Sequence, residues 1–276
     1  MPVNSRIALT IFQGRAGDRN SRAMAGAVLL GKELSVRVGV LGTVLGLPEP
    51  PLHASWDQEL KAARPGLLTL AERYEKLLTA RQLPLTVMGR CASSLATLPA
   101  IACHWPEACV VWFDAHADSN TPTSVAIPYL GGMVISGAAG MWVTGLGHGL
   151  RISNVVLVGS RDIDPDEQQL IDSGAIRLVR AGAELAFELA KAVGDRAVYV
   201  HLDCDVLEPG IVPTEYVSPN GLSLLDLRIA CETLAKGRII GLEIAEFEAT
   251  WPDSDAPVSP QGLLDSVAPL LDAMCR

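Results

Sequence analysis

Short apolar segments alternate along the chain with longer segments in which apolar residues recur every three or four positions. The short segments are nearly continuous in their apolar character, which is typical of strands in a parallel sheet covered on both faces. They predict eight strands, at residues 6–12, 36–42, 83–89, 108–114, 154–160, 175–179, 197–203 and 238–245. The longer segments predict helices that include residues 21–34, 57–80, 166–174, 182–193, 223–237 and 261–275.

This alternation of strands and helices predicts a three-layer α/β/α fold with an eight-stranded, mostly parallel sheet. No linker or low-complexity segment divides the sequence, so we expect one domain that spans residues 1–276. Two long loops interrupt the pattern, a proline-rich one at residues 46–56 and another at residues 115–132. Long loops at strand ends often carry function.

Composition narrows the classes of partner. The net charge of -9 argues against a nucleic-acid surface and favours a positively charged small substrate. No apolar run reaches the roughly 18 residues of a membrane span, and the start MPVNSRIALTIFQG lacks the features of a signal peptide. The six cysteines show no CxxC pairing, so we expect free thiols in a reducing cytoplasm. The oligomeric state is not set by the sequence, and a homo-oligomer is compatible with it.

Carboxylates and one imidazole follow the most apolar strands. Asp114 ends the fourth predicted strand and is followed by His116 and Asp118. Asp203 ends the seventh and is followed by Asp205. The carboxyl ends of parallel strands meet at one edge of a sheet, which is where the sites of such folds lie. Four carboxylates at one place repel each other unless cations lie among them. The pattern therefore predicts a metal site rather than a set of helix caps.

The chemistry of the donors predicts which metal. Oxygen-rich sites with a few nitrogen ligands suit hard divalent ions such as manganese. Two acidic segments predict two Mn²⁺ ions per chain, with Asp114 and Asp203 shared between them. A two-metal site lowers the pKa of a bound water and so supplies hydroxide at neutral pH. Glu246 and Asp164 follow two further predicted strands and are expected at the same edge.

Three motifs resemble those of a known family. DAHAD at residues 114–118, DCDVLEP at residues 203–209 and GLEIAEFE at residues 241–248 resemble the arginases and related ureohydrolases, in the order and spacing of that family. The resemblance covers essentially the whole chain. It implies a three-layer fold, a binuclear manganese cluster and hydrolysis of a guanidino group. The implied partner is a small guanidino amino-acid substrate.

The resemblance also implies roles for single residues. Asp118 would act on the reacting water and pass a proton to the leaving amine, and Glu246 would pair with the substrate guanidinium. Asn120 and Asp164 would receive the amino-acid end of the substrate. Two ligand sets are implied: Asp114, Asp118 and Asp203 for one ion, and Asp114, His116, Asp203 and Asp205 for the other.

Four positions depart from the family pattern. Ile127 stands where the family has a serine used in amino-acid recognition, and Glu208 stands where it has an aspartate. The other two are Cys91 and Gly131. Cys91, in MGRCASS, stands where the family has a histidine ligand, and we expect it to bind or contact the first ion; the alternative is a buried thiol beside a site short of one ligand. Gly131, in YLGGMV, stands where the family has a histidine that moves protons. The glycine is expected to leave open space in the substrate pocket. His201 shares a strand face with Asp203, and a role beneath the metal site is one interpretation of it.

Segments outside the metal motifs favour one branch of the family. YLGGMV, SLATLP, VLVGSRDID and DVLEPG resemble the N-omega-hydroxy-L-arginine amidinohydrolases of D-cycloserine biosynthesis, which form hydroxyurea and L-ornithine. The expected activity is therefore manganese-dependent cleavage of hydroxyarginine. An ordinary arginase, an agmatinase or guanidinobutyrase, a zinc deacylase and a degenerate non-catalytic homologue are the alternatives.

Overall fold

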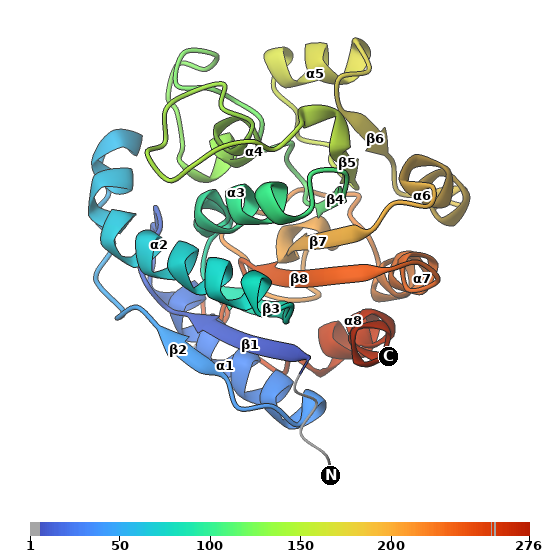
Figure 1. The fold of residues 1–276 in the computed structure, drawn as a ribbon. Coiled ribbons are helices and arrows are strands. Elements are labelled where there is room, and N and C mark those ends of the chain that lie inside the picture. Colours follow the sequence, from blue (N-terminus) through green and yellow to red (C-terminus); the bar gives the residue numbers. More distant parts are fainter. Residues whose placement is uncertain (1–5, 255, 257) are drawn as a thin grey trace.

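The core of the fold is one eight-stranded sheet in which every pairing of neighbouring strands is parallel, in the order β2-β1-β3-β8-β7-β4-β5-β6 (Figure 1). The computed structural model describes residues 6–254, 256 and 258–276. Residues 1–5, the first part of the stretch considered above for a signal peptide, lie outside the described residues. The strands are β1 (Ile7–Phe12), β2 (Thr43–Leu45), β3 (Leu83–Met88), β4 (Cys109–Phe113), β5 (Val155–Val158), β6 (Arg177–Val179), β7 (Val198–Asp203) and β8 (Ile239–Ala245).

Helices cover both faces of the sheet, which gives the expected three layers. One hydrophobic core contains buried residues of α1, α6, α7 and α8, and the other contains those of α2, α3 and α4. Within β4, Val111 contributes to the first core and Trp112 to the second, which explains its continuous apolar run. The helices are α1 (Arg22–Val38), α2 (Trp56–Thr79), α3 (Ser94–His104), α4 (Val134–Ala138), α5 (Pro165–Asp172), α6 (Leu185–Val193), α7 (Leu224–Leu234) and α8 (Gln261–Cys275).

The predicted fold class is confirmed, and one predicted strand is wrong. Residues 36–42 do not form a strand, because α1 continues to Val38 and ends at Gly39, whose φ of 68° is left-handed. Val36 is 81% exposed and Leu41 is 91% exposed, so the apolar run there is not core. The strand at this edge is the shorter β2, which pairs with β1.

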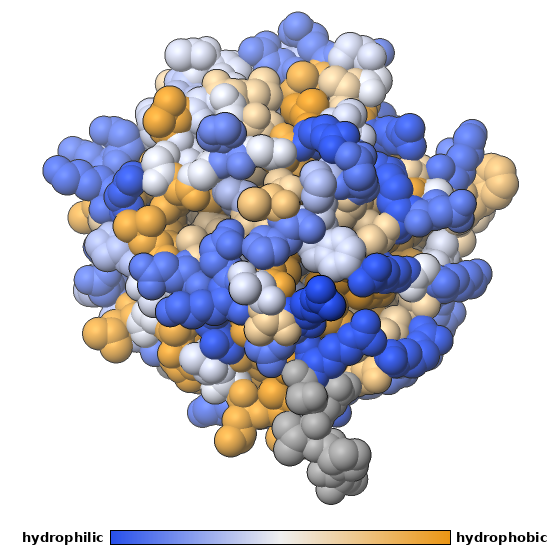
Figure 2. Space-filling model, viewed as in Figure 1, coloured by the Kyte–Doolittle hydropathy of each residue, from blue (hydrophilic) through white to orange (hydrophobic). Residues whose placement is uncertain are grey.

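The face of the molecule shown in Figure 2 has a mixed surface. Hydrophilic and hydrophobic residues are interspersed over the face shown in Figure 2, a mixture that is usual for exposed protein surface. Among the described helices, none is both long and apolar enough to cross a membrane.

The strand order brings five carboxyl ends together. Strands β3, β8, β7, β4 and β5 are consecutive in the sheet although they are far apart in the sequence. Each is followed by polar residues named above, and parallel strands present these ends at one edge. The topology therefore gathers the motifs at a single place.

Candidate metal centre

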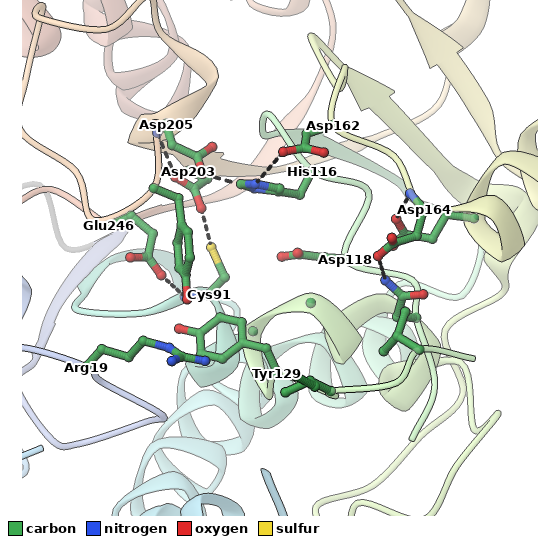
Figure 3. Close-up of a pocket in the computed structure, with 17 residues that line it drawn as sticks. Arg19, Cys91, His116, Asp118, Tyr129, Asp162, Asp164, Asp203, Asp205 and Glu246 are labelled. Atoms are coloured by element: carbon green, nitrogen blue, oxygen red, sulfur yellow. Dashed lines mark hydrogen bonds and ion pairs between the residues drawn. The ribbon is translucent and has the colours of Figure 1, made fainter. Parts of the chain in front are cut away.

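The polar strand ends line one cavity of about 460 Å³, a size usual for small-molecule sites. Figure 3 shows its labelled side chains converging from opposite walls. Cys91 begins the short turn after β3, and Asp203 is the last residue of β7. Glu246 follows β8 directly, with a φ of 64° that is uncommon for a residue other than glycine. A strained backbone at a pocket wall is a frequent mark of a functional residue.

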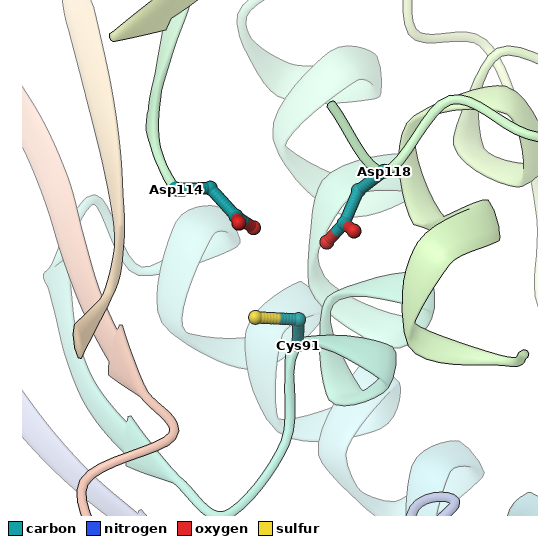
Figure 4. Close-up of side chains that lie close together, drawn as sticks. All are labelled: Cys91, Asp114 and Asp118. Carbon is teal, nitrogen blue, oxygen red and sulfur yellow. The ribbon is translucent and has the colours of Figure 1, made fainter. Parts of the chain in front are cut away.

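Cys91, Asp114 and Asp118 form the first group of potential ligands. One ligand atom from each lies within 4.8 Å of the others, and all three residues are buried. Their side chains point into a common space in Figure 4. The Oδ2 atom of Asp118 is buried and has no hydrogen-bond partner among the described residues. An unpartnered buried carboxylate oxygen beside a thiol and another carboxylate fits a site for a cation.

Asp114, His116 and Asp205 form the second group, again within 4.8 Å. His116 Nδ1 lies 3.2 Å from Asp114 Oδ1 and 3.1 Å from Asp205 Oδ2. Burial opposes charge on the imidazole, but its hydrogen bonds to Asp114 and Asp205 outweigh burial and raise the pKa of His116 far above its ordinary value. A positive charge is therefore favoured at this point, as it would be for a metal ion.

Asp203 lies beside the thiol of Cys91. Its Oδ2 accepts a hydrogen bond from Cys91 Sγ at 2.9 Å, and its Oδ1 accepts one from the Asp205 amide at 2.7 Å. Cys91, Asp203 and Glu246 make up a third group of converging ligand atoms. The Cys91 thiol thus lies among the carboxylates. That it binds an ion, and that Asp203 is shared between two ions, stay predictions.

Ionising all of these buried carboxylates without a cation among them is electrostatically unfavourable. Burial, together with the neighbouring carboxylates, raises the pKa of Asp118 and of Asp203 well above the ordinary range. Burial and the charge of Asp203 likewise raise the pKa of the Cys91 thiol. Divalent ions relieve such repulsion and hold thiolate and carboxylate ligands in their ionised forms. The donor set therefore fits a metal centre of mixed oxygen, nitrogen and sulfur ligands.

A buried polar layer supports the site from below. His201 stacks on Trp112 with ring centroids 3.5 Å apart, and its Nε2 lies 3.2 Å from Cys91 Sγ. The register places Trp112, His201 and Glu243 side by side on β4, β7 and β8. His201 Nδ1 lies 2.8 Å from Glu243 Oε1. His201 therefore contacts a potential ligand, which supports the interpretation that it orients the site.

Glu246 already has a guanidinium partner within the protein. Its Oε2 accepts a hydrogen bond from Arg90 Nη1 at 2.5 Å, and its Oε1 accepts one from the Cys91 amide at 3.1 Å. Arg90 is fully buried and also forms ion pairs with Asp18 at 3.1 Å and with Glu215 at 2.5 Å. Burial, moderated by Arg90, raises the pKa of Glu246 to about 7. The expected substrate contact would thus be made by a carboxylate that Arg90 holds in place.

Asn120 and Asp164, which are expected to bind the amino-acid end of the substrate, contact each other. Asn120 Nδ2 donates to Asp164 Oδ2 at 2.7 Å, and both residues line the cavity. Asp164 is the N-cap of α5, and Glu167 completes the capping box by accepting from the Asp164 amide at 3.0 Å. Glu167 also accepts from the Ser119 amide, so it joins the DAHAD loop to α5.

Gly131 lines the cavity, but the expected open space beside it is wrong. A Cβ atom built on Gly131 would lie 2.6 Å from Cε1 of Tyr129, so the tyrosine ring fills the space that a side chain at 131 would need. The ring lies beside Tyr216, with centroids 5.6 Å apart, and beneath the Arg19 guanidinium. Sequence reasoning attended to the glycine and missed its neighbour.

Comparison with known proteins agrees with this geometry. Residues 48–256 match the model of the arginase family. The chain belongs to the arginase family. Over 267 residues it is 39% identical to the N(omega)-hydroxy-L-arginine amidinohydrolase of Streptomyces lavendulae, covering 97% of this chain and 98% of that protein. It is 28% identical to the arginase of Bacillus caldovelox over 90% of each chain.

Solved structures show the same arginase fold. The arginase of Entamoeba histolytica in complex with L-ornithine matches with a TM-score of 0.81 at 22% identity, over 96% of this chain and 97% of that one. The proclavaminate amidino hydrolase of Streptomyces clavuligerus matches with a TM-score of 0.72 at 19% identity, over 98% and 90% of the two chains. The arginase family is metal-dependent, in keeping with the clustered ligands described above.

Sequence reasoning missed several residues of the site. Tyr129 and Tyr216 line the cavity, and Arg90 lies buried behind Glu246. All three stand outside the three family motifs, and nothing in their local sequence indicates that they meet at this place. Glu167 could have been found, because the spacing of Asp164 and Glu167 around a proline is a helix-start pattern.

Proposed function

We propose that this protein is an amidinohydrolase that cleaves N-omega-hydroxy-L-arginine to hydroxyurea and L-ornithine. The observation that carries the proposal is the 39% identity, over 97% of the chain, to an amidinohydrolase of that name. The buried donor set supports it, since thiol, imidazole and carboxylate groups converge at the strand ends. Residues 1–276 would act as one arginase-like domain. A cytoplasmic location accords with the six free cysteines.

We propose two Mn²⁺ ions as the cofactor. Cys91, Asp114, Asp118 and Asp203 would hold the first, and Asp114, His116, Asp203 and Asp205 the second. When bound, such ions supply Lewis acidity and a hydroxide nucleophile at neutral pH. The support in the chain itself is the pair of ligand groups that share Asp114.

The chain's own residues would orient the reactants and move the proton. Asp118, whose Oδ2 lacks a partner among the described residues, would accept a hydrogen bond from the attacking water. Glu246, fixed by Arg90 and the Cys91 amide, would accept an N–H of the guanidino group. Asn120 and Asp164 would bind the α-amino-acid end, which places the guanidino carbon near Asp118.

The reaction balances with one water molecule. A C–O bond forms at the guanidino carbon, and the bond from that carbon to the Nδ of the substrate breaks. One water proton is carried by Asp118 to the leaving Nδ, which departs as the primary amine of ornithine. The second water proton goes to the doubly bonded nitrogen, so the carbon keeps the new oxygen, an amino group and the hydroxylamino group and leaves as hydroxyurea.

An ordinary arginase is the second candidate, because the arginase of Bacillus caldovelox matches over 90% of the chain at the lower identity of 28%. The experiment is to measure kcat/KM for hydroxyarginine, arginine and agmatine at one pH and one Mn²⁺ concentration, with metal analysis of the same samples. We expect preference for hydroxyarginine, about two ions per chain, and loss of activity and metal in Asp203→Ala. Equal or better turnover of arginine would overturn the substrate, and a fully active Asp203→Ala protein would overturn the metal centre.

A further inference from the structure

The hydroxyl of Tyr129 is a buried polar group that the mechanism above leaves unused. The residue lines the cavity together with Cys91, Asp118 and Glu246. Its oxygen is buried and has no hydrogen-bond partner among the described residues. A buried hydroxyl without a partner costs stability, so its presence in a pocket wall points to a partner that arrives with the ligand.

The position of this tyrosine depends on the glycine two residues later. The ring occupies the space in which the Cβ of any other residue at 131 would lie, at 2.6 Å from Cε1. The Arg19 guanidinium lies 5.1 Å from the ring centroid, and the Tyr216 ring lies on another side. These neighbours hold the ring in one place. A glycine at 131 and a tyrosine at 129 therefore act as one unit.

The hydroxyl lies at the reacting end of the pocket. In Figure 3 the Tyr129 ring reaches toward the wall that carries Cys91 and Glu246 and away from Asp164. Burial, together with the negative charge of Glu246, raises the pKa of the Tyr129 hydroxyl, in keeping with a position near that carboxylate. A substrate whose amino-acid end is bound at Asp164 would thus bring its guanidino group to Tyr129.

The chemistry of a phenol distinguishes two guanidino groups. A guanidinium presents N–H donors and no acceptor, so a phenol can only accept from it. An N-hydroxyguanidine adds an oxygen that both accepts and donates. We propose that Tyr129 is a specificity-determining residue whose hydroxyl hydrogen-bonds the N-hydroxyl group of the substrate. This inference rests on the proposed function and names the side chain that selects the hydroxylated substrate.

The test is Tyr129→Phe, which removes the oxygen and keeps the ring. For hydroxyarginine we expect kcat/KM to fall about three- to tenfold, as for the loss of one neutral hydrogen bond. For arginine the change should stay within about twofold. Inhibition by L-ornithine should not change, because ornithine has no guanidino group. The melting temperature should stay the same or rise, since an unpartnered buried hydroxyl is removed.

Tyr74→Phe is the matched control. Tyr74 is also a buried phenol, but its hydroxyl is hydrogen-bonded to Thr86 at 2.7 Å and to Tyr199 at 3.0 Å, beneath α2 and outside the cavity. This variant should lower the melting temperature and leave the ratio of the two kcat/KM values unchanged. The same pattern in Tyr129→Phe would show that its hydroxyl is structural.

Further outcomes would overturn the inference. An equal loss for both substrates, a matching loss of ornithine inhibition, or a selective loss found in Tyr216→Phe and not in Tyr129→Phe would each do so. Failure of the proposed function is distinguishable from these, because it appears in the unmodified enzyme as a lack of preference for hydroxyarginine before any variant is compared.

Discussion

Replacing Arg90 by methionine is expected to destabilise the protein strongly. The Arg90 side chain is fully buried and lies 2.5 Å from Glu215, 2.5 Å from Glu246 and 3.1 Å from Asp18. Methionine fills much of the same volume but leaves the buried Asp18 and Glu246 and the partly buried Glu215 without their cation. Removing one partner of a buried ion pair costs about 3–5 kcal/mol. For a chain of this size that loss corresponds to roughly 6–20 °C in melting temperature.

The assay is urea unfolding of metal-free protein, extrapolated to water. The control is Arg228→Met, because Arg228 pairs with Glu232 on the surface at 2.9 Å and both side chains are about half exposed. That exposed pair should contribute no more than about 0.5 kcal/mol. Glu246→Gln in the Arg90→Met background should recover part of the lost stability, with a coupling of at least about 1 kcal/mol.

Two results would refute this reasoning. One is a loss below about 1 kcal/mol in Arg90→Met, which would mean that the carboxylates find water or protons at little cost. The other is strict additivity of Arg90→Met and Glu246→Gln, which would mean that the two groups do not interact as their 2.5 Å separation implies. Arg90→Lys keeps the positive charge but loses the planar guanidinium, so its free energy of unfolding should lie between those of the unmodified protein and of Arg90→Met.

Three further predictions concern the metal and the pocket. Chelation should lower the melting temperature, and free Mn²⁺ at about 100 times its Kd should restore about 2.7 kcal/mol per site. Because burial raises the pKa of Asp118 and Asp203 above their unfolded values, the metal-free protein should lose stability as the pH rises above the ordinary carboxyl range. Calorimetry should therefore show a larger stabilisation by Mn²⁺ at higher pH, and a flat or inverted trend would count against the metal centre. Cys91→His should retain or increase bound manganese by metal analysis, with Cys109→Ala, a buried thiol at the start of β4, as the neutral control; free alkylation of Cys91 in metal-loaded, fully active enzyme would exclude a ligand role. Gly131→Ala should cost about 1–3 kcal/mol in thermal unfolding because its Cβ meets the Tyr129 ring, and the cost should disappear in a Tyr129→Ala background if that contact is its cause.

The layers of the fold could be predicted because each buried strand is a continuous apolar run in the sequence. Seven of the eight predicted strands coincide with observed ones, since continuous apolar runs such as β4 pack against cores on both faces. The segment at residues 36–42 misled because Val36 and Leu41 are apolar but exposed, and a periodicity argument assumes that apolar residues are buried. Helix α3 was not predicted, since nearly all of its residues are buried and no polar face marks it.

The candidate metal ligands could be predicted for a related reason. They belong to short motifs at the ends of strands, where the parallel topology brings chain segments together without further information. Arg90, Tyr129 and Tyr216 could not be predicted, because their significance depends on contacts across the chain. The Arg90 ion pairs join residues separated by 72 and 156 positions. Such contacts follow from the whole fold and not from spacing.

Two departures from the family pattern, Cys91 and Gly131, bear on whether the chain is a degenerate homologue. Drift that removed two histidines would be expected to leave a void or an unused cavity wall at each place. Instead, the thiol of Cys91 lies between Asp203 and His201 at hydrogen-bond distance, and the space beside Gly131 is filled by the Tyr129 ring. Each replacement is matched by a neighbour that fits the new residue type. A pocket rebuilt in this way around retained carboxylates favours selection for a different guanidino substrate over loss of activity.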